Sequence, residues 1–171
     1  MATQLASKGC SIVINYSSDS STTKASALAT RLQDEYSVKA ITAKADIGSA
    51  KGPAELVSIA RDHFSSSSFS SNPPNNKTRG GGKPFEIDII VKNAGIVLPE
   101  PVGSITLENF DAQYRINVRG PMLLVQVVLP YLPTDRSGRI VDVSSIGSSI
   151  GFWYQTVYGG TKAAVEAMTR T

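Results

Sequence analysis

The chain has 171 residues, of which 41% are hydrophobic, and its net charge of +3 lacks the basic stripe typical of nucleic-acid-binding proteins. One cysteine and one histidine offer no internal disulfide and no His-rich metal site, and no apolar run approaches the roughly 20 residues that span a bilayer. Because the start also lacks a signal-peptide pattern, we expect a cytoplasmic protein without a nucleic-acid, metal or membrane partner.

Strand-like and helix-like segments alternate along the chain. The first half predicts, in order, a strand at residues 10–16, a helix at 18–37, a strand at 39–46 and a helix at 49–64. The second half predicts a strand at residues 85–91, a long helix at 106–132, a strand at 138–144 and a helix at 156–171. This alternation is typical of an open α/β domain, in which helices cover both faces of a parallel sheet.

The alternation is interrupted at residues 65–84, where serine, asparagine, proline and glycine dominate. Such a segment cannot bury enough apolar area to offset the entropy lost on ordering, so we predict a disordered insertion.

The long helix contains two informative positions. It begins with a capping-box pattern, in which Thr106 is followed by Asn109 in place of the usual acid. Pro121 lies in its interior and has no N–H, so the carbonyl of Asn117 loses its helical partner. That carbonyl could hold a water molecule, or the proline could simply kink the helix.

Polar residues follow two of the expected strands, at the sheet edge where α/β proteins bind ligands. Asn93-Ala94-Gly95 follows the strand at 85–91, and Ser144-Ser145 follows the strand at 138–144. Tyr158 and Lys162 are four residues apart, so they share one face of the last helix. If the two strands are neighbours, Ser145, Tyr158 and Lys162 converge on one crevice.

A hydroxyl, a phenol and an ammonium together suit the reduction of a carbonyl. Hydride delivery to C=O builds negative charge on the oxygen, which requires a proton and a hydrogen bond. A free tyrosine has a pKa of about 10, and an adjacent ammonium favours its phenolate form. Taken one at a time, a helical tyrosine is usually packing, a lysine is usually solvated and paired serines usually form a turn.

Four motifs together resemble the short-chain dehydrogenase/reductase family, in particular 3-oxoacyl-carrier-protein-reductase-like enzymes. They are "NAG" at residues 93–95, "INVRGP" around Asn117, "GRIVDVSS" ending at Ser145 and "YGGTK" at 158–162. The resemblance implies a Rossmann-like, doubly wound parallel sheet in three αβα layers, here as a single partial dinucleotide-binding domain over residues 1–171.

The resemblance also implies catalytic roles. Tyr158 would be the general acid/base, and Lys162 would favour its phenolate and bind the nicotinamide ribose. Ser145 would bind the substrate oxygen, and the carbonyl of Asn117 would hold a proton-relay water. Phe152 and Trp153 lie in the loop that lines the family's substrate pocket, where they could suit an aromatic or polyketide ketone or could simply pack over the site.

Cofactor residues are implied in both halves of the chain. In the family, the cofactor would be bound at positions that match Asn15, Tyr16, Ser17, Asp46, Ile47, Asn93, Ala94 and Gly95, with Tyr158 and Lys162. An acid after the first strand would bind a ribose 2′-hydroxyl and favour NAD, but no acid follows Asn15 until Asp19. We therefore predict NADP rather than NAD.

The chain also departs from the family. The family's first strand and its T-G-x-x-x-G-x-G turn, which binds pyrophosphate, have no counterpart, and residues 1–8 resemble only the second half of the helix that follows. The last two strands are missing too, so we expect an incomplete sheet with a gap between the strands at Ile12 and Ile89. Lys92 stands where the family usually has asparagine; it would place a positive charge beside the cofactor cleft, or it is a neutral variation.

Three functional interpretations follow. The chain is an NADP-dependent oxidoreductase that acts on a ketone or secondary alcohol. Alternatively, it is a truncated, non-catalytic fragment or pseudoenzyme with little or no turnover. In the third, it pairs with a full-length relative or forms a homo-oligomer through the helices at 106–132 and 156–171.

Overall fold

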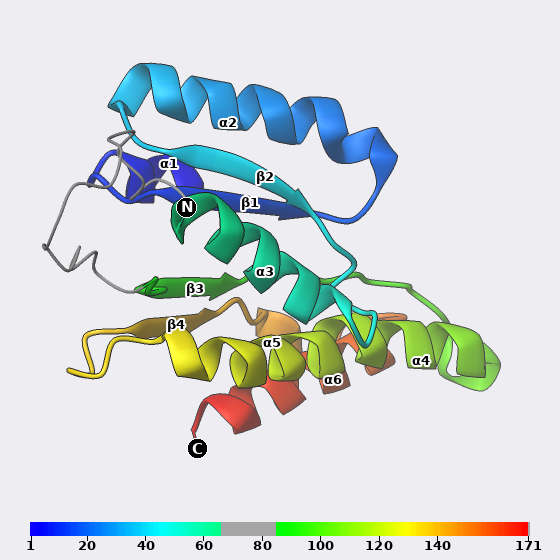
Figure 1. Ribbon diagram of the computed structural model, residues 1–171. Helices are drawn as coiled ribbons and strands as arrows, with labels where there is room; N and C mark the ends of the chain where they lie inside the picture. Colours follow the sequence, from blue (N-terminus) through cyan, green and yellow to red (C-terminus); the bar gives the residue numbers. More distant parts are fainter. Residues whose placement is uncertain (66–84, 171) are drawn as a thin grey trace, which may run out of the picture. The chain divides into compact units, whose positions relative to one another are not determined.

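A computed structural model describes residues 1–65 and 85–170 (Figure 1). The insertion expected at residues 65–84 lies outside the described residues, except for Ser65, which is the last residue of a helix. The chain divides into two compact units, Met1–Asp46 with Ala54–Phe85 and Ile47–Pro53 with Glu86–Thr171.

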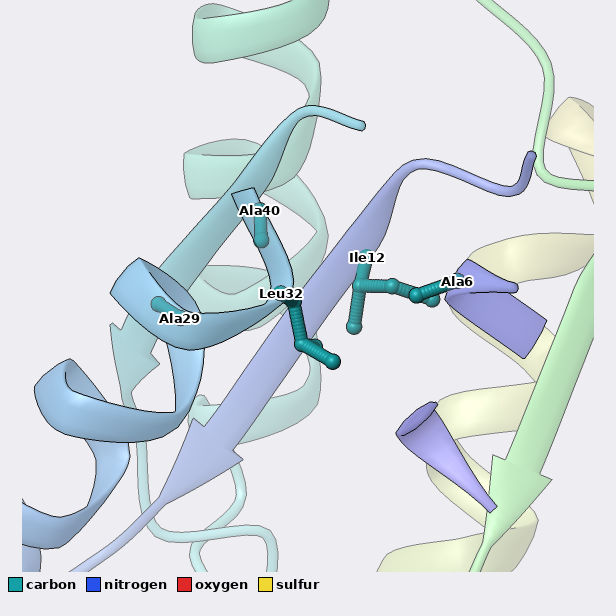
Figure 2. Packing of buried hydrophobic residues seen from close by; sticks show 5 residues of the cluster. All are labelled: Ala6, Ile12, Ala29, Leu32 and Ala40. Carbon is teal, nitrogen blue, oxygen red and sulfur yellow. The ribbon is translucent and has the colours of Figure 1, made fainter. Parts of the chain in front are cut away.

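The first unit contains a parallel pair of strands, β1 (Ile12–Tyr16) and β2 (Ala40–Lys44), with Ile12 opposite Ala40. The helices are α1 (Ala2–Ala6), α2 (Thr22–Tyr36) and α3 (Gly52–Ser65), whose first two residues fall in the second unit. The core of this unit gathers small and branched side chains from α1, α2 and both strands, namely Ala6, Ile12, Ala29, Leu32 and Ala40 (Figure 2). Leu32 is fully buried there, as expected for the apolar face of an amphipathic helix.

The second unit contains the parallel pair β3 (Ile89–Lys92) and β4 (Arg139–Asp142), with Ile89 opposite Arg139. The helix predicted at 106–132 consists of α4 (Leu107–Tyr114), a π-helical turn (Arg115–Arg119), α5 (Gly120–Val128) and a 3₁₀ turn (Leu129–Tyr131). A 3₁₀ turn at Ile146–Ser148 follows β4, and α6 (Thr156–Thr169) completes the unit.

The first turn of α4 shows half of the predicted capping box. The Asn109 N–H donates to Thr106 Oγ1 over 3.2 Å, as an N-cap threonine requires. The Asn109 side chain does not return to Thr106, because its amide donates to Glu100 Oε1 over 2.9 Å.

The parallel pairing expected from the strand–helix alternation is confirmed. Within the described residues the strands form two separate pairs, β1–β2 and β3–β4, so β1 and β3 each have an edge without a strand partner. None of the described helices combines the length and apolar character needed to cross a membrane.

Lys92 and Asp142 are directly opposite each other at the ends of β3 and β4. Lys92 Nζ lies 2.8 Å from Asp142 Oδ1, and the side chains are only 8% and 9% exposed. The contact is mainly electrostatic, because this oxygen makes no well-oriented hydrogen bond, while Oδ2 accepts one from the Thr169 hydroxyl. The positive charge expected at Lys92 is therefore balanced within the unit, since the register of the strands gives it a buried acidic partner.

Removing one member of this pair should leave an uncompensated buried charge. We expect Lys92→Met to lower the free energy of unfolding by about 3 kcal/mol, and the double variant Lys92→Met/Asp142→Val to recover most of that loss. Chemical denaturation of both variants measures the difference. Arg31→Met is the control, because the exposed Arg31–Glu35 pair is 4.0 Å apart and its loss should cost less than about 1 kcal/mol. A Lys92→Met variant as stable as the control would contradict the interpretation.

Candidate active site

The centre of the long helix departs from α-helical bonding. The N–H of Gly120 donates to the carbonyl of Arg115, five residues earlier, and this π-helical turn directly precedes Pro121. Pro121 has no N–H, so the carbonyl of Asn117 cannot receive the ordinary α-helical bond. Short π-helical segments are frequent at functional sites.

Gly120 is packed tightly against the segment that follows Asp46. A Cβ atom at Gly120 would lie 2.5 Å from the Ile47 carbonyl oxygen and 2.7 Å from Ile47 Cγ2. The Arg119 guanidinium donates to the Gly48 carbonyl over 2.7 Å. Ile47, an expected cofactor residue, is therefore buried against the long helix, whereas Asp46 in the first unit is exposed.

The side chain of Asn117 joins two parts of the second unit. It exchanges two hydrogen bonds of 2.8 Å with the backbone of Ile96, directly after Asn93-Ala94-Gly95. Its amide also lies 3.1 Å from Thr161 Oγ1 on α6. The side chain is therefore committed to these contacts, and the water-binding role of the Asn117 backbone carbonyl stays a prediction.

Lys162 is a buried cation of this unit, with 5% of its surface exposed. Its Nζ donates to the Val143 carbonyl over 2.6 Å, at the end of β4. The same nitrogen lies 5.7 Å from the centre of the Tyr158 ring. It also lies 3.7 Å from the place that a Cβ of Gly95 would occupy, so no side chain at this exposed glycine separates its backbone from the ammonium.

Ser145 and Tyr158 both lie close to Gly147. The Ser145 hydroxyl oxygen accepts from the Gly147 N–H over 3.1 Å. The Cβ position of Gly147 lies 3.4 Å from Ser145 Oγ, 3.8 Å from Tyr158 Cδ1 and 3.6 Å from Phe152 Cδ2. The structure thus brings together Ser145, Tyr158 and Phe152, whereas Trp153 is 86% exposed and touches the ring of Tyr154.

The cofactor residues expected after β1 belong to the first unit. The Asn15 amide donates to the carbonyls of Ala43 (3.1 Å) and Ala45 (3.0 Å), so it braces the end of the β1–β2 pair. Tyr16 is half-buried and Ser17 is exposed. Asp19 is 2.5 Å from Lys44 Nζ, and this hydrogen bond and the charge of Asp19 raise the pKa of Lys44.

One acidic contact near Ser145 was missed by the sequence reasoning. Glu166 Oε1 accepts from the hydroxyls of Ser144 (2.5 Å) and Ser148 (2.6 Å), on either side of Ser145. The available signal was its position four residues after Lys162 on the same helix. Within the described residues, no group of three His, Cys, Asp or Glu side chains is arranged to hold a metal ion.

A family profile described as short chain dehydrogenase matches residues 82–171, which is more than half of the chain. The chain belongs to the short-chain dehydrogenase family. The motifs around Asn117, Ser145, Tyr158 and Lys162 all fall within the matched residues.

Two fungal relatives align with the whole chain. The L-xylo-3-hexulose reductase of Hypocrea jecorina (strain QM6a) is 42% identical over 177 residues, and the L-xylulose reductase of Aspergillus niger is 43% identical over 180 residues. The chain spans 55% and 56% of these proteins, so it corresponds to about half of their length.

Two solved structures show the same fold. A blue fluorescent protein from a metagenomic library, crystallised in complex with NADPH, matches 98% of the chain with a TM-score of 0.79 and 27% identity. A landomycin C-6 ketoreductase with bound NADP and rabelomycin matches 98% with a TM-score of 0.81 and 24% identity. The chain covers 59% and 60% of these structures, so the predicted Rossmann-like fold is confirmed as part of a larger whole.

Two adjacent glycines of α6 allow a matched test of the Ser145–Tyr158 arrangement. A Cβ at Gly159 would lie 2.6 Å from the Gly147 carbonyl oxygen, whereas a Cβ at Gly160 would lie 3.2 Å from Tyr114 Oη, the end of a side chain that can move. We expect Gly159→Ala to lower the free energy of unfolding by about 1–3 kcal/mol and to shift the amide resonances of residues 145–149. Gly160→Ala should change both little. Equal effects of the two variants in denaturation and NMR experiments would contradict this packing.

Proposed function

We propose that this protein is an NADP-dependent oxidoreductase that transfers hydride between the cofactor and a ketone or secondary alcohol. The observation that carries the proposal is the convergence of a hydroxyl, a phenol and a buried ammonium within one unit of the fold. Ser145 and Tyr158 meet at Gly147, and Lys162 lies beside the Tyr158 ring and the exposed Gly95.

The chain's own residues would handle the substrate oxygen and its proton. The Ser145 hydroxyl accepts a bond from Gly147 N–H, so its own proton remains to be donated to the substrate oxygen. Tyr158 would give its phenolic proton to the developing alkoxide, and the ammonium of Lys162 would stabilise the phenolate that remains. The Asn117 carbonyl would bind a water molecule that returns a proton to the site.

The exposed backbone at Gly95 fits a nicotinamide cofactor, which when bound would supply the hydride. No side chain at Gly95 separates that face from Lys162 Nζ, whose ammonium has three N–H donors and uses one for Val143. Another N–H could therefore bind a ribose hydroxyl. Asn93 and Ala94 are exposed next to it, as expected for residues that line a cofactor.

The residues that follow β1 support the preference for NADP over NAD. The first acid after the strand, Asp19, is engaged by Lys44 and is therefore a poor acceptor for a ribose 2′-hydroxyl. Ser17 and Ser18 are exposed and neutral, which leaves room for a 2′-phosphate. The metagenomic relative, 27% identical, was crystallised with NADPH.

The names of the two fungal relatives favour a ketose as the substrate. Both are reductases of sugar ketones and are 42% and 43% identical to the chain over its whole length. We therefore propose a polyhydroxy ketone rather than the aromatic or polyketide ketone that Phe152 and Trp153 could suit. A cytoplasmic location stays a prediction.

Association with a second copy or a longer relative is the second candidate function. Large apolar side chains on α4 and α5 are exposed, including Leu107 at 82%, Met122 at 41% and Phe110 at 39%. This is the surface that the resemblance assigns to subunit contacts. Co-purification with a tagged longer relative would support pairing, and a strictly monomeric chain would count against it.

NADPH binding and turnover test the enzymatic proposal. We expect the purified chain to bind NADPH, as followed by nicotinamide fluorescence, and to oxidise it in the presence of L-xylulose. Tyr158→Phe should keep cofactor binding within about threefold and lose at least about 100-fold in turnover, because it lacks the proton donor. Lys162→Met should weaken NADPH binding and lower turnover.

Two controls make the result decisive. NADH in place of NADPH should bind more weakly, since the Asn15–Ser18 segment carries no acid. Absence of NADPH binding up to millimolar concentration would reject the enzymatic proposal for this chain and favour the non-catalytic alternative.

A further inference from the structure

Glu166 bridges the two ends of the turn that carries Ser145. It lies on α6, one helical turn after Lys162, and is half-buried. Its Oε1 accepts from Ser144 Oγ over 2.5 Å and from Ser148 Oγ over 2.6 Å. A single carboxylate oxygen therefore contacts the residue immediately before Ser145 and the residue three positions after it.

We propose that Glu166 is a positioning residue that holds Ser145 as a hydrogen-bond donor to the substrate. Its effect on catalysis rests on the proposed function, whereas its effect on the order of the turn does not. Glu166 acts through Ser144 and Ser148.

The number of hydroxyl protons in the turn explains why the acceptor shared by Ser144 and Ser148 should be a carboxylate. Each serine hydroxyl carries one proton, and Ser148 Oγ lies close to two acceptors, Glu166 Oε1 at 2.6 Å and the Ser145 carbonyl at 2.8 Å. An ionised acceptor forms the stronger bond, so Ser148 donates to Glu166. The Ser145 carbonyl then keeps the backbone N–H of Ser148 at 3.0 Å, which closes the turn.

The surroundings of Glu166 favour the ionised form. The hydrogen bond from Ser144, followed by that from Ser148 and the positive charge of Arg170, holds the pKa of Glu166 below its usual range. Glu166 is thus a carboxylate at neutral pH and can accept both protons.

Exchange of the backbone amides in the turn tests the proposal without cofactor or substrate. The N–H groups of Gly147, Ser148, Ser149 and Ile150 all bond to Ser145 or Ile146. In the full chain, we expect Glu166→Ala to accelerate their exchange about tenfold, because hydrogen bonds to a charged group are among the stronger ones. Glu166→Gln keeps a neutral acceptor and should accelerate it less. Amides of β1 and β2 in the first unit should not change in either variant.

A serine pair gives a second test if Glu166→Ala does not fold. Ser148→Ala removes a donor to Glu166 and should loosen the turn, whereas Ser149→Ala removes an exposed neighbour that does not reach Glu166 and should not. Unchanged exchange in Ser148→Ala and Glu166→Gln, or equal acceleration throughout α6 and β4, would overturn the positioning role.

Turnover separates positioning from the proposed function. If NADPH-dependent reduction is observed, Glu166→Gln should lower kcat for the ketone, while the Kd for NADPH, which does not depend on Glu166, should change less. A turn that is looser without a fall in kcat would overturn the catalytic part of the proposal. If the wild-type chain shows no reduction, the proposed function fails, while the exchange data still decide whether Glu166 orders the turn.

Discussion

The second unit depends on the burial of one ammonium group. A lysine loses much of its hydration when it is buried, so it requires hydrogen-bond acceptors inside the protein. Lys162 has the Val143 carbonyl at the end of β4, and this contact brings α6 to the point where the strand gives way to Ser144 and Ser145. The π-helical turn and the two-way bond between Asn117 and Ile96 bring the segment after β3 to the same place. The candidate site lies where α6, the end of β4 and the segment after β3 come together.

Much of this arrangement could be predicted from local patterns. Apolar runs gave the four described strands to within a few residues, and the helical spacing of Tyr158 and Lys162 placed both on one face. Pro121 correctly indicated an irregularity in the long helix, but a missing N–H does not determine whether the helix kinks or inserts an extra residue. The family could be predicted from motifs of fixed spacing, because four of them occur in the expected order.

The remaining features depend on contacts between distant segments. The pairing of Lys92 could not be predicted, because its partner, Asp142, is 50 residues away and becomes its neighbour only through the register of β3 and β4. Glu166 was overlooked because a glutamate on a helix is usually solvated, and nothing local indicates that two serines lie beside it. Asn15 stays a predicted cofactor residue, and the structure adds that its amide holds the ends of β1 and β2 together. In each case a contact between distant segments adds what the residue type alone does not indicate.

Trp153 gives the site a built-in optical reporter. It is the single tryptophan of the chain, it is 86% exposed and it lies in the loop between Ser145 and Tyr158. The emission of an exposed indole is dominated by water, so anything that covers this loop, such as a ligand or another protein chain, would change the colour of the fluorescence. Because the chain has no second tryptophan, its tryptophan emission reports the environment of this loop alone.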